Sequence, residues 1–348
     1  MLQYIARRFL VLPLILFLVT LILFGLMLQL PVEMRAEVYM PSVGSNATAE
    51  QMAQITETII RRYGLDEPLP VQYAAWVKSL LVGEWGYSPV WKESVLEGLL
   101  RRVPASAELA LAAMVPAIVL AVVLGSVSSR CDGRFVGQFV RGTAFVGWAF
   151  PSFILGLMML NVLYAWLRWF PPGRLSTWAS VIVNGGGFRT YTGMYTVDAL
   201  LNGNVAILLD ALRHLILPAS SLGLAQWALL TRIMRSSLLE ALRQDYITTA
   251  RAKGVDERKV VNVHARRNAI LPVVSASSVA VSMLISGLVV IETVFDMNGV
   301  GGAATKAILA GDVSVVIGFT VFTCLVTMLS SLAADITYAF IDRRVTLG

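Results

Sequence analysis

Long apolar runs separated by polar segments set the pattern of this chain. Each run holds roughly 20 mostly apolar residues, which is the length of a helix that crosses a bilayer. The runs extend over about residues 9–30, 107–127, 143–166, 216–233, 270–291 and 313–333. Pro151 lies inside the third run and predicts a kink there. The pattern therefore predicts an all-α membrane protein with six transmembrane helices.

Three polar segments fall on one side of the predicted bundle. Residues 31–102 carry acids and bases in near balance and include a helix-like stretch from Ala49 to Tyr63. A second segment covers residues 173–210, and a glycine-rich turn covers Met297 to Gly302. Each follows an odd-numbered run, so all three lie outside the cytoplasm if the amino end lies inside.

Composition excludes a water-soluble protein, because 57% of the residues are hydrophobic and only 14% are charged. The net charge of +6 is concentrated in the remaining polar segments: residues 130–141 hold three arginines and one aspartate, and residues 232–267 hold nine bases and four acids. The positive-inside rule places both segments, and the tail from Asp342 to Arg344, in the cytoplasm. We therefore expect both termini to be cytoplasmic. The same rule explains the basic loop without a nucleic-acid partner.

The most informative stretch is DYITTARAKGVDERKVVNVHARRNAILP, residues 245–272 between the fourth and fifth runs. Tyr246, Ala250 and Gly254 are four residues apart and would share one face of a helix. Two of these positions have minimal side chains, so another surface could approach the backbone closely. The spacing fits a rigid loop that docks on a cytoplasmic partner. A surface helix placed there by its positive charge is the alternative.

This stretch resembles the cytoplasmic EAA motif of binding-protein-dependent ABC importer permeases, in the form of the dipeptide, oligopeptide and nickel subfamily. Thr248 and Thr249 depart from the general importer pattern but resemble this subfamily. Further blocks, such as residues 63–73 and 291–295, resemble the family along most of the chain. Asn298 stands where the family usually has proline. The matching positions are Asp245, Tyr246, Thr249, Ala250, Arg251, Ala252, Lys253, Gly254, His264, Arg267, Asn268 and Pro272.

The resemblance implies a type I ABC importer fold in a bacterial inner membrane. It implies a single permease domain over residues 1–348, an extracytoplasmic segment at 31–102 and a coupling loop at 236–268. Expected partners are a second, related permease, two cytoplasmic ATPase subunits and an extracytoplasmic substrate-binding protein, besides membrane lipid. The chain has no phosphate-binding loop of its own. ATP and Mg are therefore expected on the ATPase subunits, and the chain is expected to be a transport subunit rather than an enzyme. Peptides are the expected substrate, with nickel, glutathione and oligosaccharides left open.

Within the membrane, Glu292 and Phe295 are the candidates for the pathway or its gate, because ionisable groups are rare and costly there. The alternative for Glu292 is an interfacial carboxylate that caps a helix or pairs with a neighbour. His214 and His264 are each solitary in the sequence, so neither a metal pair nor a Ser-His-Asp grouping is expected. A self-sufficient secondary transporter or channel is the competing class, although neither inverted repeats nor a line of intramembrane charges is found. A membrane-embedded hydrolase is the third class.

Overall fold

The computed structural model describes residues 2–40, 48–130 and 133–341. Asp132 and the tail from Asp342 to Arg344, which entered the topology prediction, lie outside the described residues. The chain divides into two compact units, one formed by Met1–Val103 with Gly299–Leu329 and the other by Pro104–Asn298 with Ser330–Gly348.

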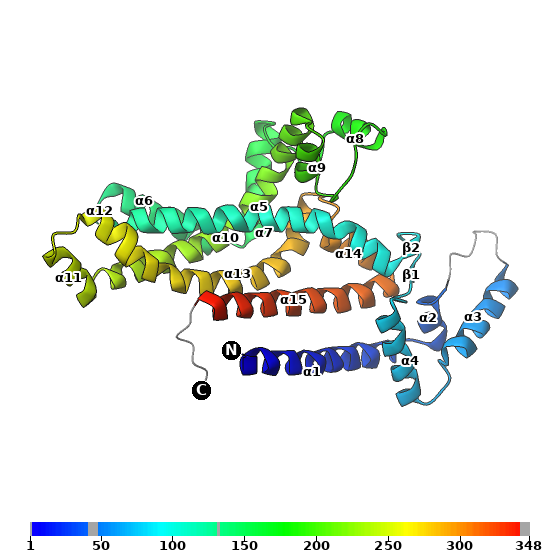
Figure 1. Cartoon of the computed structure of the whole chain (residues 1–348). Coiled ribbons are helices and arrows are strands. Elements are labelled where there is room, and N and C mark those ends of the chain that lie inside the picture. Colours follow the sequence, from blue (N-terminus) through cyan, green and yellow to red (C-terminus); the bar gives the residue numbers. More distant parts are fainter. Residues whose placement is uncertain (1, 41–47, 131–132, 342–348) are drawn as a thin grey trace. The chain divides into compact units, whose positions relative to one another are not determined.

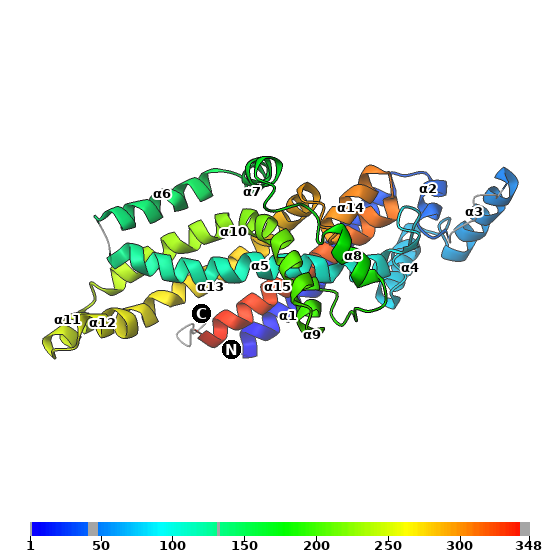
Figure 2. The ribbon, with the colours of Figure 1, turned by 90° about the horizontal axis from the view of Figure 1, so that it is seen from above.

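The first unit is built on two long helices and a set of short ones. Its elements are α1 (Leu2–Met27), α2 (Val32–Glu37), α3 (Ala49–Tyr63), α4 (Leu69–Val82), β1 (Tyr87–Ser88), β2 (Glu93–Ser94), the start of α5 (Val95–Arg130), α14 (Val300–Leu309) and most of α15 (Val313–Ile341). Figures 1 and 2 show α1 beside α15. Phe24 of α1, Trp76 of α4 and Ile317 of α15 are buried in one apolar cluster, which holds these helices together. The helix predicted from Ala49 to Tyr63 is confirmed as α3.

A buried carboxylate fixes the start of α15. Asp312 is 3% exposed and precedes the first residue of the helix. Its Oδ1 accepts a hydrogen bond of 3.0 Å from the Val315 backbone N–H, and its Oδ2 accepts one of 2.6 Å from the Ser88 hydroxyl. Asp312 thus caps the helix and ties it to the β1–β2 hairpin.

The second unit is a bundle around one long helix. Its elements are the rest of α5, α6 (Phe135–Ala149), α7 (Ser152–Met159), the π-helical turn η1 (Leu160–Trp166), α8 (Thr177–Asn184), α9 (Tyr195–Leu201), α10 (Val205–Ala241), α11 (Asp245–Ala252), α12 (Glu257–Lys259), the π-helical turn η2 (Val260–Ala265) and α13 (Arg266–Val294). Helix α10 packs along α13, α6, α7 and α9. The core is apolar and includes Leu109 of α5, Leu230 of α10 and Ile291 of α13, none of them exposed.

Glycines let α5 and α10 approach closely at two levels. A Cβ on Gly223 would lie 2.7 Å from the Ala113 carbonyl oxygen, and one on Gly125 would lie 2.7 Å from Cβ of Met234. Contacts this short leave no room for a side chain. Small residues at helix contacts are typical of membrane bundles, where close packing holds helices together.

The predicted spans lie largely in helices, several of which extend beyond the predicted span. Helix α5 begins at Val95 rather than Ala107, and α10 covers 205–241 rather than 216–233. A search for apolar runs misses such ends because the helices continue into polar sequence. The turn predicted from Met297 to Gly302 is shorter, since α14 begins at Val300. The kink at Pro151 is confirmed as a break, with the helices on either side at 105°.

Three described helices are long and apolar enough to cross a membrane: Val95–Arg130, Val205–Ala241 and Val313–Ala333. Two bent pairs raise the number to as many as five if each counts as one span: Phe135–Ala149 with Ser152–Trp166, and Glu257–Val281 with Met283–Val294. Within α1, the stretch Val11–Met27 is apolar but shorter. The chain is therefore a multi-helix membrane protein.

Replacing Asp312 with alanine is expected to lower the free energy of unfolding by about 2 kcal/mol, because a cap and the acceptor of a buried hydroxyl are lost together. Denaturant unfolding of the full chain in detergent measures this change. Asp66→Ala, which removes an exposed carboxylate from the same unit, is the control and should have little effect. Equal effects of the two substitutions would contradict the role of Asp312.

Candidate functional site

The stretch singled out in the sequence forms a compact helical loop between α10 and α13. Figures 1 and 2 show α11 and α12 beyond the ends of these two long helices. The chain leaves α10 at Ala241, forms α11, turns at Gly254 and returns through α12 and η2 directly into α13. The loop thus consists of a helix, a glycine turn and a second helical stretch.

Gly254 ends α11 and does not extend its face. Its φ of +74° is in the left-handed region. Its N–H donates to the Arg251 carbonyl at 2.9 Å, while the Val255 N–H donates to the Ala250 carbonyl at 3.2 Å. This pair of bonds is a Schellman motif, which favours glycine at this position. The prediction that Tyr246, Ala250 and Gly254 share one helical face was therefore wrong, because the helix stops at Ala252.

The inner face of the loop belongs to the core of the bundle. Ile247 of α11 and Val260 and Ala265 of η2 are fully buried in the same apolar cluster as the side chains of α10 and α13. Arg130, the last residue of α5, donates a hydrogen bond to the Asn262 side chain. Because its apolar side is packed against the long helices, the loop is joined to them rigidly.

The outer face of the loop carries the residues predicted for docking. Of those twelve positions only Ala250 is half-buried, packed against the core, and the others are exposed: Asp245, Tyr246, Thr249, Arg251, Ala252, Lys253, Gly254, His264, Arg267, Asn268 and Pro272. Eleven of the twelve docking candidates are thus exposed, on the loop and on the first turns of α13.

An ion pair spans the turn of the loop. Arg251 donates to the two carboxylate oxygens of Glu257 from Nε at 3.0 Å and from Nη2 at 2.7 Å. These hydrogen bonds lower the pKa of Glu257 below its ordinary value and raise that of Arg251. The pair is exposed, so solvent weakens it. It joins α11 to α12 across Gly254.

A groove of about 780 Å³ opens beside the loop, between the end of α10 and the start of α13. Asn268 donates to the Tyr246 hydroxyl at 3.0 Å on its wall. Polar residues such as Ser237, Glu240 and Gln244 line it together with apolar ones. The groove is therefore of mixed polarity rather than purely apolar, and it adjoins the docking face.

Glu292 and Phe295 lie at the other end of α13 and are buried, at 1% and 0% exposed. The Ser106 hydroxyl of α5 donates to Glu292 Oε1 at 2.5 Å. The Phe295 ring lies against Gly156 of α7, where a Cβ would be 3.0 Å from it. Both side chains are enclosed by the described helices, and the hydrogen bond from Ser106 matches the alternative for Glu292, a carboxylate that pairs with a neighbour.

The turn after Phe295 explains one departure from the family pattern. Asp296 and Asn298 have φ values of 52° and 48°. Proline, which fixes φ near −65°, cannot adopt the left-handed conformation that Asn298 has, whereas asparagine tolerates it. The residue in place of the usual proline therefore fits the observed turn.

Buried carboxylates organise the segment from 173 to 210. Glu108 Oε1 accepts from the Thr196 N–H and hydroxyl, each at 2.7 Å, and Oε2 accepts from Arg174 at 2.8 Å. Asp198, which is fully buried, accepts from the N–H groups of Tyr191, Thr192 and Gly193 and from the Thr192 hydroxyl. The segment is thus held in place by carboxylates from α5 and α9.

His214 is not solitary, as the sequence had suggested. Its Nε2 lies 3.2 Å from the Ser176 hydroxyl and 3.9 Å from Asp210. Ser176 itself donates to Asp210 from its hydroxyl at 2.7 Å and from its N–H at 2.8 Å, and His214 Nδ1 faces the Pro172 carbonyl at 3.0 Å. In a catalytic triad the serine also lies at Nε2, but the carboxylate binds Nδ1. Here Nδ1 of His214 faces the Pro172 carbonyl instead, and Asp210 lies on the Nε2 side. These residues therefore fasten the segment to α10 and do not form a nucleophilic site.

These contacts could be only partly foreseen from the sequence. Asp210 and His214 have a visible i, i+4 spacing, but Ser176 lies 34 positions before Asp210, so no local motif joins them. Asp198 is the one acidic residue of α9, and no sequence motif indicates its partners. Only the fold shows that Asp198 accepts from the turn just before its helix, and that Asp210 and His214 meet Ser176.

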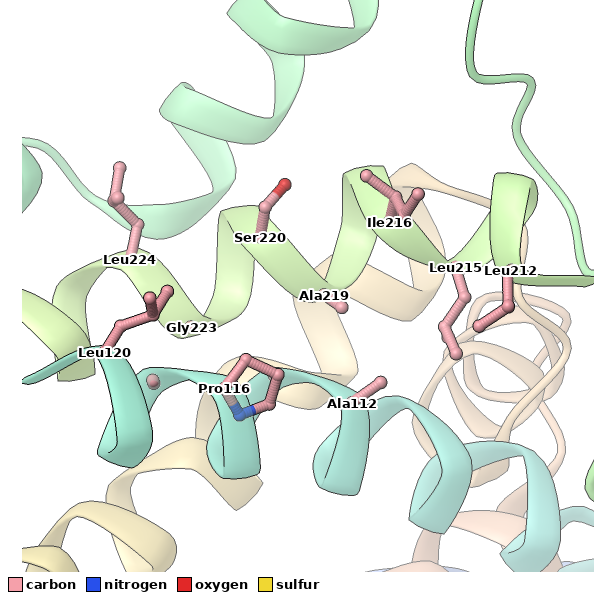
Figure 3. A pocket seen from close by; sticks show the side chains of 12 residues that line it. Ala112, Pro116, Leu120, Leu212, Leu215, Ile216, Ala219, Ser220, Gly223 and Leu224 are labelled. Carbon is pink, nitrogen blue, oxygen red and sulfur yellow. The ribbon is translucent and has the colours of Figure 1, made fainter. Parts of the chain in front are cut away.

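A second groove, of about 450 Å³, lies between α5 and α10. Figure 3 shows Ala112, Pro116 and Leu120 of α5 opposite Leu215 and Ala219 of α10. Apart from the Ser220 hydroxyl the labelled side chains are apolar, so the groove suits hydrocarbon.

Long apolar helices joined to an exposed loop are the features of a multi-pass membrane protein. Residues 117–347 match the family described as binding-protein-dependent transport system inner membrane component, and residues 1–110 match its N-terminal region. The chain belongs to this family. It is a multi-pass inner-membrane permease subunit of an ABC importer of the dipeptide, oligopeptide and nickel type, as the loop sequence predicted.

Curated relatives agree over most of the chain. The chain is 37% identical over 295 residues to a probable D,D-dipeptide transport system permease protein of Escherichia coli, covering 84% of this chain and 85% of the relative. It is 35% identical to a di/tripeptide transport system permease protein of Pseudomonas aeruginosa and 33% identical to an oligopeptide transport system permease protein of Bacillus subtilis. The last two alignments cover 99% of both chains.

Arg251→Gln is expected to raise the pKa of Glu257 back toward its ordinary value. Since the pKa is lowered in the folded chain, the contribution of the pair to stability is present above the ordinary pKa and is lost as the pH falls through the lowered value. Carbon-13 NMR of the labelled Glu257 carboxyl measures the shift. Lys253→Gln, at a neighbouring exposed base, is the control. A Glu257 pKa that does not respond to Arg251→Gln would refute the assigned cause.

Asp198→Ala is expected to cost about 3 kcal/mol of stability, because several donors of one turn lose their shared carboxylate acceptor at once. Hydrogen exchange at the amides of residues 191–193 should accelerate together with the loss. Asn184→Ala, an exposed change in the same segment, should leave both readouts unchanged. Unaltered exchange in the Asp198 variant would show that the carboxylate does not hold the turn.

Proposed function

We propose that this chain forms the translocation pathway of an ATP-driven peptide importer together with a second, homologous permease. Peptides are favoured because the relatives just named are dipeptide, di/tripeptide and oligopeptide permeases. The observation that carries the proposal is the loop from α11 to η2, whose outer face is exposed and whose inner face is buried in the bundle. Such a loop can receive a force on one side and pass it to α10 and α13 on the other.

The proposed topology has six spans with both termini in the cytoplasm, within a single permease domain covering residues 1–348. Residues 31–102 lie outside the cell membrane as one segment, and residues 236–268 form the cytoplasmic coupling loop. The charge distribution supports this orientation, because residues 232–267 carry nine bases and four acids.

The proposed engine is a pair of cytoplasmic ATPase subunits that hold ATP and Mg, while this chain has no cofactor and no catalytic site. The ATPases bind the exposed face that includes Arg251, Lys253 and Gly254. They can drive a change of state only if they bind the inward-open and outward-open forms with different affinity. Because Ile247 and Val260 are fully buried against the long helices, displacement of the loop moves those helices with it.

On the outer side, we propose that a substrate-binding protein delivers the peptide to the permease pair. Glu292 and Phe295 then act in the gate rather than on an open pathway wall, because both are buried. The hydrogen bond from Ser106 to Glu292 joins α5 to α13, so it must break or shift if these helices separate. Membrane lipid surrounds the pair, and no nucleic acid takes part.

Gly254→Trp is expected to uncouple ATP hydrolysis from uptake, because a bulky group at the tip of the loop blocks close docking. In proteoliposomes that hold the whole complex, ATP-dependent uptake should fall about tenfold or more, with ATPase subunits bound less firmly after purification. A self-sufficient transporter would show uptake without ATP.

Gly133→Trp is the matched control for this test. Gly133 also has a positive φ, of 79°, and both glycines have open space within 4 Å of the point where a Cβ would lie. Both substitutions therefore carry similar backbone strain, but Gly133 lies outside the coupling loop. Normal coupled transport by the Gly254 variant, or equal loss in both variants, would contradict the docking role.

Glu292→Ala is expected to reduce uptake about tenfold while the ATPase subunits stay bound, since the hydrogen bond between α5 and α13 is lost. Uptake by the purified complex in proteoliposomes measures the effect. Thr293→Ala changes an exposed neighbour and should transport normally. Wild-type uptake by the Glu292 variant would remove this residue from the gate.

A further inference from the structure

A third groove, of about 260 Å³, combines arginines with apolar walls. It lies between the end of α5, the middle of α6 and the second half of α10, all within the second unit. One stripe of lining residues comes from α6, spaced for a single helical face, and a matching stripe comes from α10. The lining residues are Ser128, Val140, Arg141, Ala144, Phe145, Trp148, Ala228, Leu229, Thr231, Arg232 and Arg235.

Two of these arginines are available for an anionic ligand. In the described part of the chain no carboxylate forms an ion pair with Arg141 or Arg232. The Arg232 guanidinium lies over the Trp148 ring, 5.4 Å from its centroid. Stacking holds a guanidinium by its face and leaves the N–H groups at its edge free to bind a phosphate in a bidentate manner.

A buried polar atom in the same groove lacks a partner. Thr231 is 3% exposed, and within the described residues its hydroxyl oxygen has no hydrogen-bond partner. A buried hydroxyl without a partner is costly and is normally satisfied by protein, water or ligand. A ligand with several oxygens would supply the acceptor.

The outer wall of the groove is apolar and uncovered by this chain. Phe145 is 74% exposed and Trp148 is 50% exposed. Arg141 lies six residues into α6, about 9 Å from its start, and Arg232 lies nine residues before the end of α10, about 14 Å from it. The charges are thus near the end of the bundle that carries the basic loop, while Phe145 and Trp148 lie farther from that end along α6.

We propose that this groove binds an anionic phospholipid of the cytoplasmic leaflet. The lipid phosphate sits between Arg141 and Arg232, and an acyl chain lies along Phe145, Ala144 and Leu229. Charge complementarity and the apolar wall together favour a lipid over a soluble anion, because basic pockets between helices on the cytoplasmic side suit anionic headgroups. The assignment to the cytoplasmic leaflet rests on the topology in the proposed function, whereas the assignment of the lipid-binding residues does not.

The test is native mass spectrometry of the full chain in its purified complex, incubated with phosphatidylglycerol or phosphatidylcholine. The wild type should retain phosphatidylglycerol in preference to phosphatidylcholine. The double variant Arg141→Gln, Arg232→Gln should retain phosphatidylglycerol about thirtyfold more weakly, and Arg141→Lys, Arg232→Lys should restore part of the retention. Arg134→Gln, at the exposed residue before α6, is the matched control and should behave as the wild type.

Undiminished phosphatidylglycerol retention by the glutamine double variant would overturn the proposal. Displacement of the lipid by inorganic phosphate at equal concentration would also overturn it, since it would indicate a site for soluble anions. If the glutamine double variant lost a protein subunit while its lipid count stayed unchanged, a partner protein would cover the groove instead of a lipid. The same spectra report whether ATPase subunits are bound, so a failure of the proposed function is read separately from a failure of the lipid site.

Discussion

The burial of the loop between α10 and α13 is the constraint on which the account depends. Ile247, Val260 and Ala265 have no exposed surface, and they share one apolar cluster with the long helices. Loops on a protein surface are usually mobile because few buried contacts hold them. This loop instead continues the bundle, closed by a Schellman turn at Gly254. Its exposed residues are therefore presented with fixed geometry, which is what a coupling element between two proteins requires.

At the opposite end of α10, order comes from polar contacts rather than apolar ones. Glu108, Asp198 and Asp210 are buried carboxylates that accept hydrogen bonds from the segment between η1 and α10. Buried carboxylates without partners would be costly, and here backbone and side-chain donors satisfy them. The bundle thus has a packed, apolar attachment at the loop end and a hydrogen-bonded one at the other. Helices α5, α10 and α13 connect the two.

The sequence predicted the elements that depend on local pattern. Apolar runs located the long helices, Pro151 located the break, and the text from Asp245 to Pro272 indicated the helical loop and the family. It failed at one local turn and where distant residues meet. Gly254 seemed to extend a helical face, but its hydrogen bonds to a completed turn decide its role. His214 seemed solitary because Ser176 is far away in the chain. The groove lined by Arg141 and Arg232 joins α6 to α10 across some 90 positions of the sequence. Such sites arise from packing, which periodicity does not encode.

The most direct test is labelling of Ala252→Cys, at the exposed end of α11, with a membrane-impermeant maleimide. The chain would carry serine in place of its two native cysteines. The account predicts labelling in inside-out vesicles stripped of ATPase subunits, strong protection when the ATPase subunits are added back, and no labelling of intact cells. Labelling from the cell exterior, or labelling that the ATPase subunits leave unchanged, would contradict it.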